Sequence, residues 1–336
     1  MVSTFISRRA AVAAGLLAAL APGVASAQGA APDKNWPDKN WPEKNVRVVV
    51  AFAAGGAADV VARLVGQSLG ERWGKTVVIE NRGGGGGNIG AQAVARAEPD
   101  GYTLLITTSA IAVNLTYYDN PGYSNADLKT VALLATQPNI IVGAKDLKAD
   151  NLREVIALSV KENLSYGTAG PGTTPHLSAE RIFRLIGKAD IRHVPFTGAA
   201  PAVAATVSGH VPLASVALSG AIEQVKGGLV KGLAVTSLER FPDLPNVPTV
   251  KETGLGEIDD ATWVAAYAPA KTPAAIVQRI NADMSAALKE PRVRDGLVRA
   301  GYLPLGGPLD EADRFMQSET RKWGEVVRAS GVKAAN

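Results

Sequence analysis

The sequence predicts an α/β protein, and three observations support this. Short β-branched apolar runs alternate with segments of helical periodicity, first at 47–52 and 57–73. Glycine-bearing turns join several of these strands to the next helix. With 336 residues, 46% of them hydrophobic, the chain is long enough for two domains or one large α/β domain. Strands that alternate with helices favour parallel sheets with helices on both faces.

Each element is assigned, in chain order, from one of two patterns. A β-branched run bounded by glycine, proline or asparagine indicates a strand, and apolar residues three and four apart indicate a helix. The predicted strands are 47–52, 76–80, 102–107, 130–135, 140–143, 165–168, 191–194, 211–217, 233–235 and 263–268. The predicted helices are 57–73, 88–97, 152–161, 175–186, 198–208, 221–226, 274–288, 291–300 and 310–330. Ligands of such sheets bind beyond the carboxyl ends of the strands.

The first 27 residues have the three parts of an export signal. Ser7, Arg8 and Arg9 form a basic start, 10–21 an apolar stretch and 25–27 a small-residue cleavage site. We therefore expect a periplasmic protein. The paired arginines match a twin-arginine signal in part, so that route and the Sec route both stay open. A buried first helix is the structural alternative.

Residues 28–45 repeat the pattern Pro-Asp-Lys-Asn-Trp and are rich in proline and charge. They lack periodicity, so we interpret them as a leader or linker, either flexible or docked on the surface. A functional repeat is the alternative. After the signal the sequence has no run of about 18 apolar residues, so the mature protein is expected to be soluble.

The composition excludes several classes of function. The chain has no cysteine, which rules out disulfides, thiolate metal ligands, a cysteine nucleophile and a lipoprotein anchor. Without Arg8 and Arg9, the 35 basic residues fall to 33 against 31 acidic ones, a net charge of +2. This balance, with no basic cluster among aromatic residues, argues against nucleic-acid binding.

Three strand-to-helix junctions carry glycines, at 52–59 (FAAGGAAD), 81–88 (NRGGGGGN) and 167–176 (GTAGPGTTPH). Each leaves unpaired N–H groups at the start of a helix, where the helix dipole also favours an anion. The junctions are therefore candidate anion sites. In the alternative interpretation the glycines serve turn geometry alone, and Asp59 satisfies the helix dipole without touching a ligand.

Catalytic and cofactor motifs are weak or missing. A G-x-G-x-x-G pattern at 85–90 begins too far after its strand for a dinucleotide fingerprint, and neither G-x-S-x-G nor H-E-x-x-H occurs. The histidines, His176, His193 and His210, are too few for a histidine metal cage. His176 either orients a carboxylate or caps and packs its helix. We expect no enzyme activity, no metal and no cofactor.

From about Trp41 to the C-terminus the chain resembles the Bug family, the periplasmic solute-binding proteins of tripartite tricarboxylate transporters. The similarity lies in 46–110, around the first two loops, and in YGTAGPGTTPHLSAE (166–180), VPFTGAAPAVAATVSGHV (194–211) and KGLAVTSLERFPDLPNVPTVKETG (231–254). It implies a two-lobed Venus-flytrap fold with two crossing segments, near 140–143 and 263–268. Lobe 1 would be discontinuous, comprising 46–139 and 267–336, and lobe 2 would be 140–266.

The resemblance also implies that loops of both lobes grip a ligand, usually a small carboxylate, partly through water. Carried over by position, lobe 1 would contribute Phe52, Ala54, Gly55, Gly56, Ala57, Asp59, Thr108 and Ser109. Lobe 2 would contribute Thr168, Ala169, Gly170, Gly172, Thr173, Thr174, His176, Phe196, Thr197 and Gly198.

The chain departs from the family pattern in two places. Ala51, Ala53 and Ala54 stand where prolines are common around the aromatic residue of the first loop. The segment 214–219 (ASVALS) lacks an acidic residue commonly seen nearby. An amino-group ligand is therefore less favoured than a plain di- or tricarboxylate or an aromatic acid.

We therefore predict a periplasmic solute-binding protein that captures a small carboxylate between two lobes. As a monomer, it would deliver this ligand to the membrane subunits of a transporter. Two alternatives stay open: an exported α/β hydrolase that uses His176 with a threonine or serine, and a ligand sensor that signals to a membrane kinase.

Overall fold

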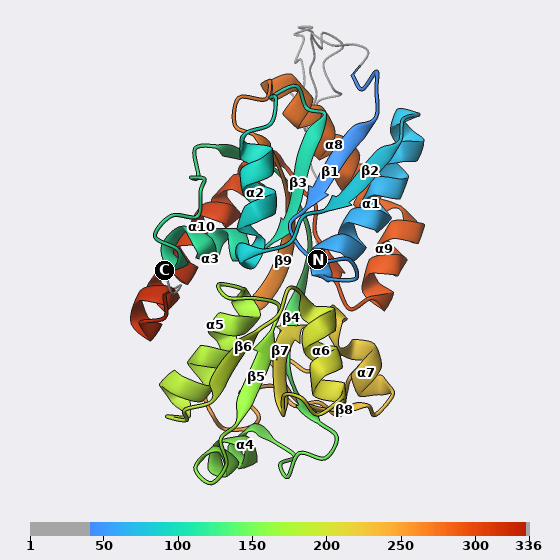
Figure 1. The fold of residues 1–336 in the computed structure, drawn as a ribbon. Coiled ribbons are helices and arrows are strands. Elements are labelled where there is room, and N and C mark those ends of the chain that lie inside the picture. Colours follow the sequence, from blue (N-terminus) through green and yellow to red (C-terminus); the bar gives the residue numbers. More distant parts are fainter. Residues whose placement is uncertain (1–40, 334–336) are drawn as a thin grey trace, which may run out of the picture. The chain divides into compact units, whose positions relative to one another are not determined.

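The 17-residue strand β4 (Leu128–Ala144) runs through two groups of strands. The structure, a computed structural model, describes residues 41–333. Up to Pro138, β4 pairs antiparallel with β9 (Ala261–Pro269). From Asn139 onward it pairs antiparallel with β7 (Leu213–Ala217). Figure 1 shows β4 between β9, in the first group, and β7, in the second.

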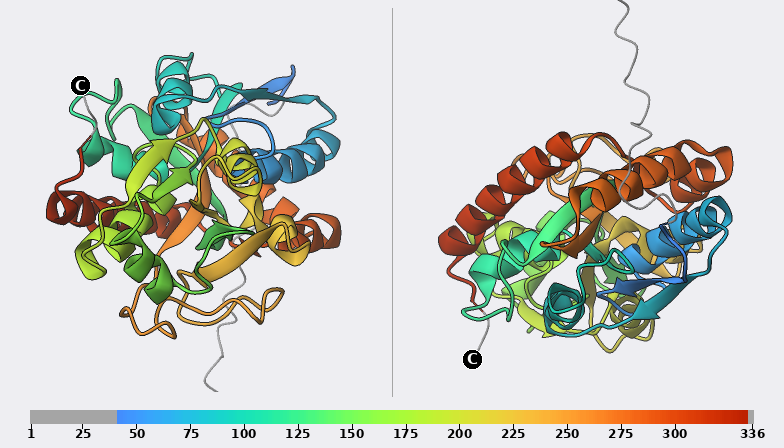
Figure 2. Two further views of the ribbon diagram at one scale, coloured as in Figure 1. Left: turned by 60° about the horizontal axis from the view of Figure 1, so that its bottom comes forward. Right: turned by 90° about the horizontal axis from the view of Figure 1, so that it is seen from above.

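The first group has the strand order β2–β1–β3–β9–β4, and the short β10 also pairs with β4. Its other strands are β1 (Val46–Val50), β2 (Val77–Asn81), β3 (Thr103–Thr108) and β10 (Leu303–Pro304). Its helices are α1 (Ala57–Trp73), α2 (Asn88–Ala95), α3 (Ala110–Tyr117), α8 (Ala274–Lys289), α9 (Pro291–Arg299) and α10 (Leu309–Ser330). One core of buried side chains joins these elements. The right view of Figure 2 shows the orange α8 and the red α10 on the same side of this sheet.

The second group consists of β6 (Arg192–Pro195), β5 (Ser165–Thr168), β7, the end of β4 and β8 (Val230–Val235). Its helices are α4 (Leu152–Ser159), α5 (Thr174–Glu180) with its continuation η2 (Arg181–Ile186), α6 (Ala199–Val207) and α7 (Ile222–Lys226). Successive side chains of a strand point to opposite faces. Ile140 and Val142 accordingly join the core on the α6 side, and Ile141 joins the core on the α5 side.

The predicted α/β class is confirmed, but the expectation of parallel sheets holds only for β1 with β2 and β3 and for β5 with β6 and β7. β9 runs antiparallel to both β3 and β4, and β4 runs antiparallel to β7 and β8. The predicted strands 130–135 and 140–143 are parts of the single strand β4. A parallel order follows from strand–helix–strand connections. β9 follows β8 with no helix between them, and it lies antiparallel between β3 and β4.

Helix α3 was not predicted from the sequence. Apart from Asn114 its residues, AIAVNLTY, are apolar, aromatic or β-branched, and Ala110, Ile111, Ala112, Val113, Asn114 and Tyr117 are all buried. Because the helix has almost no polar face, its sequence lacks the alternation that reveals an amphipathic helix.

The predicted signal at 1–27 and the repeats up to residue 40 lie outside the described residues. At the end of the predicted leader, Trp41 is buried, with its ring centroid 5.1 Å from that of Trp73 and 6.0 Å from that of Tyr102. Within residues 41–333, no helix is long and apolar enough to cross a membrane.

Candidate functional site

Hydrogen bonds to a buried carboxylate, Asp59, fix the loop between β1 and α1. Asp59 accepts hydrogen bonds from the Gly55 N–H, Asn81 Nδ2 and Arg63 Nε, each at 2.9 Å. Asn81 Nδ2 also donates to the Phe52 carbonyl, so both ends of the loop are tied to one point. Burial opposes ionisation of Asp59, but the hydrogen bonds from Arg63, Gly55 and Asn81 outweigh it and lower the pKa. Asp59 therefore braces the loop.

The loop between β5 and α5 is closed by its own hydroxyl groups. Thr173 Oγ1 donates to the Gly170 carbonyl at 2.8 Å, and the Gly170 N–H donates to Thr168 Oγ1 at 3.2 Å. Thr168 Oγ1 also lies 2.7 Å from His193 Nε2. Gly170 and Gly172 have φ of +135° and +73°, backbone conformations that favour glycine. The sequence of this loop therefore fixes its shape.

His176 and His193 form a stacked pair beneath this loop, with ring centroids 4.0 Å apart. His176 Nδ1 accepts a hydrogen bond from the Gly172 N–H at 3.3 Å, which requires an unprotonated nitrogen. Burial, together with His193, lowers the pKa of His176 to about 3, and burial lowers the pKa of His193 to about 4. Both rings are neutral near pH 7, and His176 supports the loop as a hydrogen-bond acceptor.

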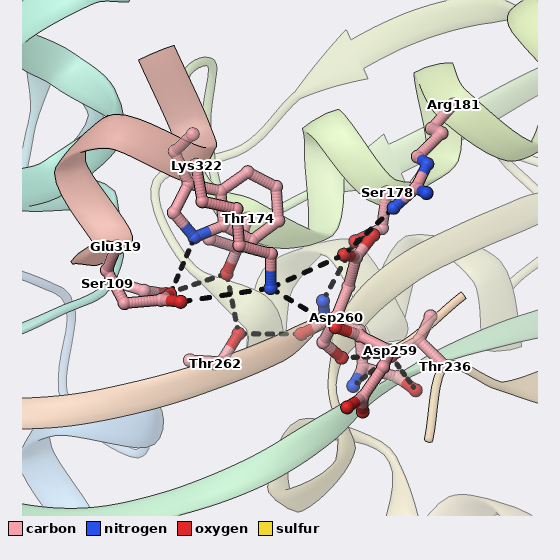
Figure 3. Close-up of polar contacts among 12 residues, drawn as sticks. Ser109, Thr174, Ser178, Arg181, Thr236, Asp259, Asp260, Thr262, Glu319 and Lys322 are labelled. Carbon is pink, nitrogen blue, oxygen red and sulfur yellow. Dashed lines mark hydrogen bonds and ion pairs between the residues drawn. The ribbon is translucent and has the colours of Figure 1, made fainter. Parts of the chain in front are cut away.

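A chain of side-chain hydrogen bonds connects the two groups of strands (Figure 3). Ser109, at the start of α3, lies 2.7 Å from the Thr174 hydroxyl at the start of α5. Thr174 in turn lies 2.9 Å from Thr262 of β9, and Thr262 donates to Asn139 Oδ1 of β4 at 2.6 Å. Since Thr262 gives its proton to Asn139, Thr174 donates to Thr262 and Ser109 donates to Thr174.

The chain ends at a buried carboxylate. Asn139 Nδ2 donates to Ser178 Oγ, and Ser178 Oγ donates to Asp260 Oδ2, both at 3.1 Å. Arg181, after α5, and Lys322, on α10, lie 3.2 and 3.9 Å from Asp260 Oδ1. Burial raises the pKa of Asp260, and the two cations oppose this in part. Helices from both groups thus meet at one acidic side chain.

A second connection lies at Tyr302, between α9 and β10. Its hydroxyl donates to the Ala57 carbonyl at 2.9 Å and lies 2.8 Å from Ser219 Oγ. The Ser219 N–H donates to Gln137 Oε1 of β4 at 2.6 Å. Polar contacts therefore join the two groups at Ser219 as well as at Thr174.

An inner cavity of about 30 Å³ lies where helix starts converge. Gly56, Thr173 and Gly198 immediately precede α1, α5 and α6, and all three line it. Thr108, at the end of β3, lines it as well. The remaining lining residues are Phe52, Ala57, Ala169, Pro175, Ala199, Ala217 and Thr262. The starts of three helices thus surround one small cavity.

An outer cavity of about 410 Å³ adjoins the inner one, because Phe52 and Ala169 line both. Its other lining residues are Gly84, Gly85, Gly86, Gly87, Gly170, Pro171, Pro195, Phe196 and Thr197. Among residues 41–333, no charged side chain lines either cavity. Thr173 and Thr262 give their hydroxyl protons to Gly170 and Asn139. The donors left for an anion in the inner cavity are therefore the N–H groups of the helix starts and the Thr108 hydroxyl. A groove of about 730 Å³ between 123–130 and α10 lies away from these loops.

Ten of the predicted site residues line one or both cavities: Phe52, Gly56, Ala57, Thr108, Ala169, Gly170, Thr173, Phe196, Thr197 and Gly198. Eight do not line either: Ala54, Gly55, Asp59, Ser109, Thr168, Gly172, Thr174 and His176. Several of these eight hold the loops in place. Sequence reasoning missed Thr262, Ala217, Ala199, Pro171, Pro175 and Pro195. It gave the junction at 81–88 as a candidate anion site but named none of its glycines as a ligand contact. Thr262 stands near the start of β9, and its place beside the cavity follows only from the pairing of β9 with β3.

The fold and site define a class of protein, the two-lobed periplasmic solute-binding protein. The structure superposes on the periplasmic binding protein BugD with a TM-score of 0.83 at 31% identity, covering 87% of this chain and 99% of that one. An R. palustris protein with adipate gives 0.83 at 34% identity, covering 87% and 98%. MatC from Rhodopseudomonas palustris with bound malate gives 0.81 at 32%, covering 85% and 100%.

Comparison of sequences places the chain within this class. Residues 61–332 match the family described as the tripartite tricarboxylate transporter family receptor. The chain is 34% identical over 323 residues to an Agrobacterium vitis protein of the ttuE–ttuC′ intergenic region, covering 94% of this chain and 90% of that protein. It is 31% identical to BugT of Bordetella pertussis, covering 86% and 90%. The chain belongs to the tripartite tricarboxylate transporter receptor family.

The family assignment removes the hydrolase alternative, since these proteins bind substrates and are not enzymes. The geometry agrees with this. The hydrolase hypothesis requires His176 to act as a base, but its Nδ1 accepts from a backbone N–H and its ring stacks on His193. The protein is a periplasmic solute-binding protein.

Proposed function

We propose that this protein closes two lobes, 46–139 with 267–336 and 140–266, around a small carboxylate and presents it to the membrane subunits of a transporter. The single observation that carries the proposal is the convergence of the starts of α1, α5 and α6 on one cavity. Relatives with bound adipate and malate support the choice of a carboxylate.

The affinity of such a site can come from backbone groups. A helix N-terminus stabilises an anion by about 0.3–1 kcal/mol when exposed and up to about 2 kcal/mol when partly buried. A hydrogen bond to a charged group adds about 1.5–3 kcal/mol. Three helix starts and the hydroxyl of Thr108 therefore suffice for micromolar binding, which needs about 8 kcal/mol in total.

Entry of the ligand requires the lobes to separate. The inner cavity measures about 30 Å³, the share of one water molecule in the liquid, and a dicarboxylate is several times larger. Ser109 and Thr174 bridge the lobes, and so do Tyr118 and Pro171, whose oxygens lie 3.4 Å apart. We infer that these contacts break on opening and that bound acid favours the closed form by linking the loops of both lobes.

The proposal is tested with purified protein and a panel of mono-, di- and tricarboxylates. Thermal unfolding should shift upward with any acid that binds, by an amount that follows mass action, and titration calorimetry should give the Kd. Thr108→Val removes a hydroxyl that lines the inner cavity and should weaken binding, whereas Thr108→Ser should retain it. If no acid stabilises the protein, the proposed function fails.

A further inference from the structure

The two cavities lie next to each other, since Phe52 and Ala169 line both. An acid whose carboxylate occupies the inner cavity is several times larger than that cavity, and the outer cavity is the neighbouring space for its remaining atoms. The lining of the outer cavity therefore bears on which acids are accepted.

The side chains that line the outer cavity are mostly apolar. They include the rings of Phe52 and Phe196 and the rings of Pro171 and Pro195, and the glycine run at 84–87 adds backbone alone. Thr197, at the rim, carries the one polar side chain among the described lining residues. Its volume of about 410 Å³ lies in the range of small-molecule pockets.

Two glycines leave room for the aromatic rings. A Cβ at Gly87 would lie 3.1 Å from Phe52 Cζ, and a Cβ at Gly167 would lie 3.0 Å from Phe196 Cε2. Each ring therefore packs directly against backbone. Because both rings are confined in this way, the apolar wall is preorganised.

We propose that the outer cavity receives an uncharged apolar tail, so that this protein prefers aromatic or aliphatic monocarboxylates to dicarboxylates. The inference rests on the proposed function, because it assigns the second half of the same ligand. A second carboxylate placed there would lose its hydration beside phenylalanine and proline rings, and Thr197 is the one lining side chain that could replace that water. An apolar tail would instead gain from leaving water.

Hexanoate and adipate form the sharpest test, because they have the same chain length and differ by the second carboxylate. 3-Phenylpropionate adds an aromatic tail. We expect calorimetry on the wild-type protein to give a Kd for hexanoate and 3-phenylpropionate at least tenfold below that for adipate. Adipate binding as tightly as hexanoate, or more tightly, would overturn the inference and leave the proposed function standing. If no acid binds, the proposed function itself fails.

Three variants give the preference a structural readout. Phe196→Ala should weaken 3-phenylpropionate about tenfold, and Phe196→Leu should restore part of the loss. Thr197→Lys places a cation at the exposed rim and should shift the preference toward adipate, a gain that loss of folding cannot imitate. Ile89→Ala is the matched control: this side chain is exposed beside the glycine run and does not line the cavity. Unchanged selectivity in both Phe196→Ala and Thr197→Lys would contradict the assignment.

Discussion

The hydroxyl groups of Ser109 and Thr174 lie 2.7 Å apart, although 65 residues separate them in the chain. Ser109 belongs to the first group of strands and Thr174 to the second, so this hydrogen bond joins the two groups. Thr174 also stands at the start of α5, one of the three helix starts proposed to bind the carboxylate.

Ser109→Ala should weaken ligand binding by favouring the open form. Thr174 keeps its bond to Thr262, so the change removes only the bond between Ser109 and Thr174. A buried hydrogen bond contributes about 0.5–1.5 kcal/mol, which predicts a Kd raised by about two- to tenfold. Calorimetry with a bound acid measures this. Ser318→Ala, on an exposed part of α10, is the control, and an unaltered Kd in Ser109→Ala would rule out the bridging role.

Gly86→Ala should hinder closure. A Cβ at this position would collide with the Pro171 carbonyl of the opposite lobe. Gly85→Ala is a matched control, because its φ of +58° is close to the +63° of Gly86 but its nearest contact is Asn88 Cβ at 3.5 Å. The two variants carry similar backbone strain. Small-angle scattering with saturating acid should show a larger radius for Gly86→Ala than for Gly85→Ala, and equal radii would refute the steric argument.

Stability should fall as the solution becomes acidic, because of His176 and His193. Burial lowers their pKa values from 6.5 to about 3 and about 4. Below about pH 6.5 the unfolded chain therefore binds protons that the folded chain does not bind. The stabilisation is complete above this pH and decreases toward pH 4 by at most about 1.4 kcal/mol per pH unit for each histidine.

Urea unfolding between about pH 7 and pH 5 measures this slope. A variant with both His176→Gln and His193→Gln should show a shallower dependence, even if it is less stable at neutral pH. His210→Gln, on an exposed turn, should keep the wild-type slope. The same slope in all three proteins would show that the stacked pair is not the cause.

Asp260→Asn should cost little stability, and Asp260→Ala should cost more. Burial raises the pKa of this carboxyl despite Arg181 and Lys322, so its negative charge is not a net gain. Asparagine can still accept from Arg181 and hydrogen-bond to Ser178, whereas alanine leaves these groups unpaired. We expect a loss of under about 1 kcal/mol for asparagine and about 1–3 kcal/mol for alanine. Denaturant titration measures the free energy of unfolding of both variants. A loss for Asp260→Asn above about 1 kcal/mol would mean that the charge itself stabilises the fold.

The sequence predicted the local elements better than their arrangement. Helix α1 and strand β5 were predicted with their observed bounds, because a glycine turn and a clear periodicity mark them. β4 was predicted as two strands, since Gln137-Pro138-Asn139 looks like a break. In the structure, Pro138 is paired with Ala261 at the point where the partner of β4 changes from β9 to β7. Proline has no N–H to donate to a neighbouring strand, so within a strand it occurs where the regular pairing is interrupted.

The candidate site was partly predictable for a similar reason. Gly56, Thr173 and Gly198 stand directly before helices, and that position is readable in the sequence. Thr262 and Ala217 could not be found in this way, because they reach the cavity only through antiparallel pairing with distant strands. The glycine run at 84–87 has no local signal for its role, which depends on the lobe that faces it.

The uninterrupted β4 restricts how the two lobes can move. Its backbone is hydrogen-bonded to β9 in the first group of strands and to β7 and β8 in the second, so a straight separation of the two groups would break some of these hydrogen bonds. Twisting this strand about its own length changes each residue's dihedrals only slightly and keeps the ladders. We therefore expect the lobes to move by a small twist distributed along β4, so that changes in this strand should alter how readily the empty protein closes.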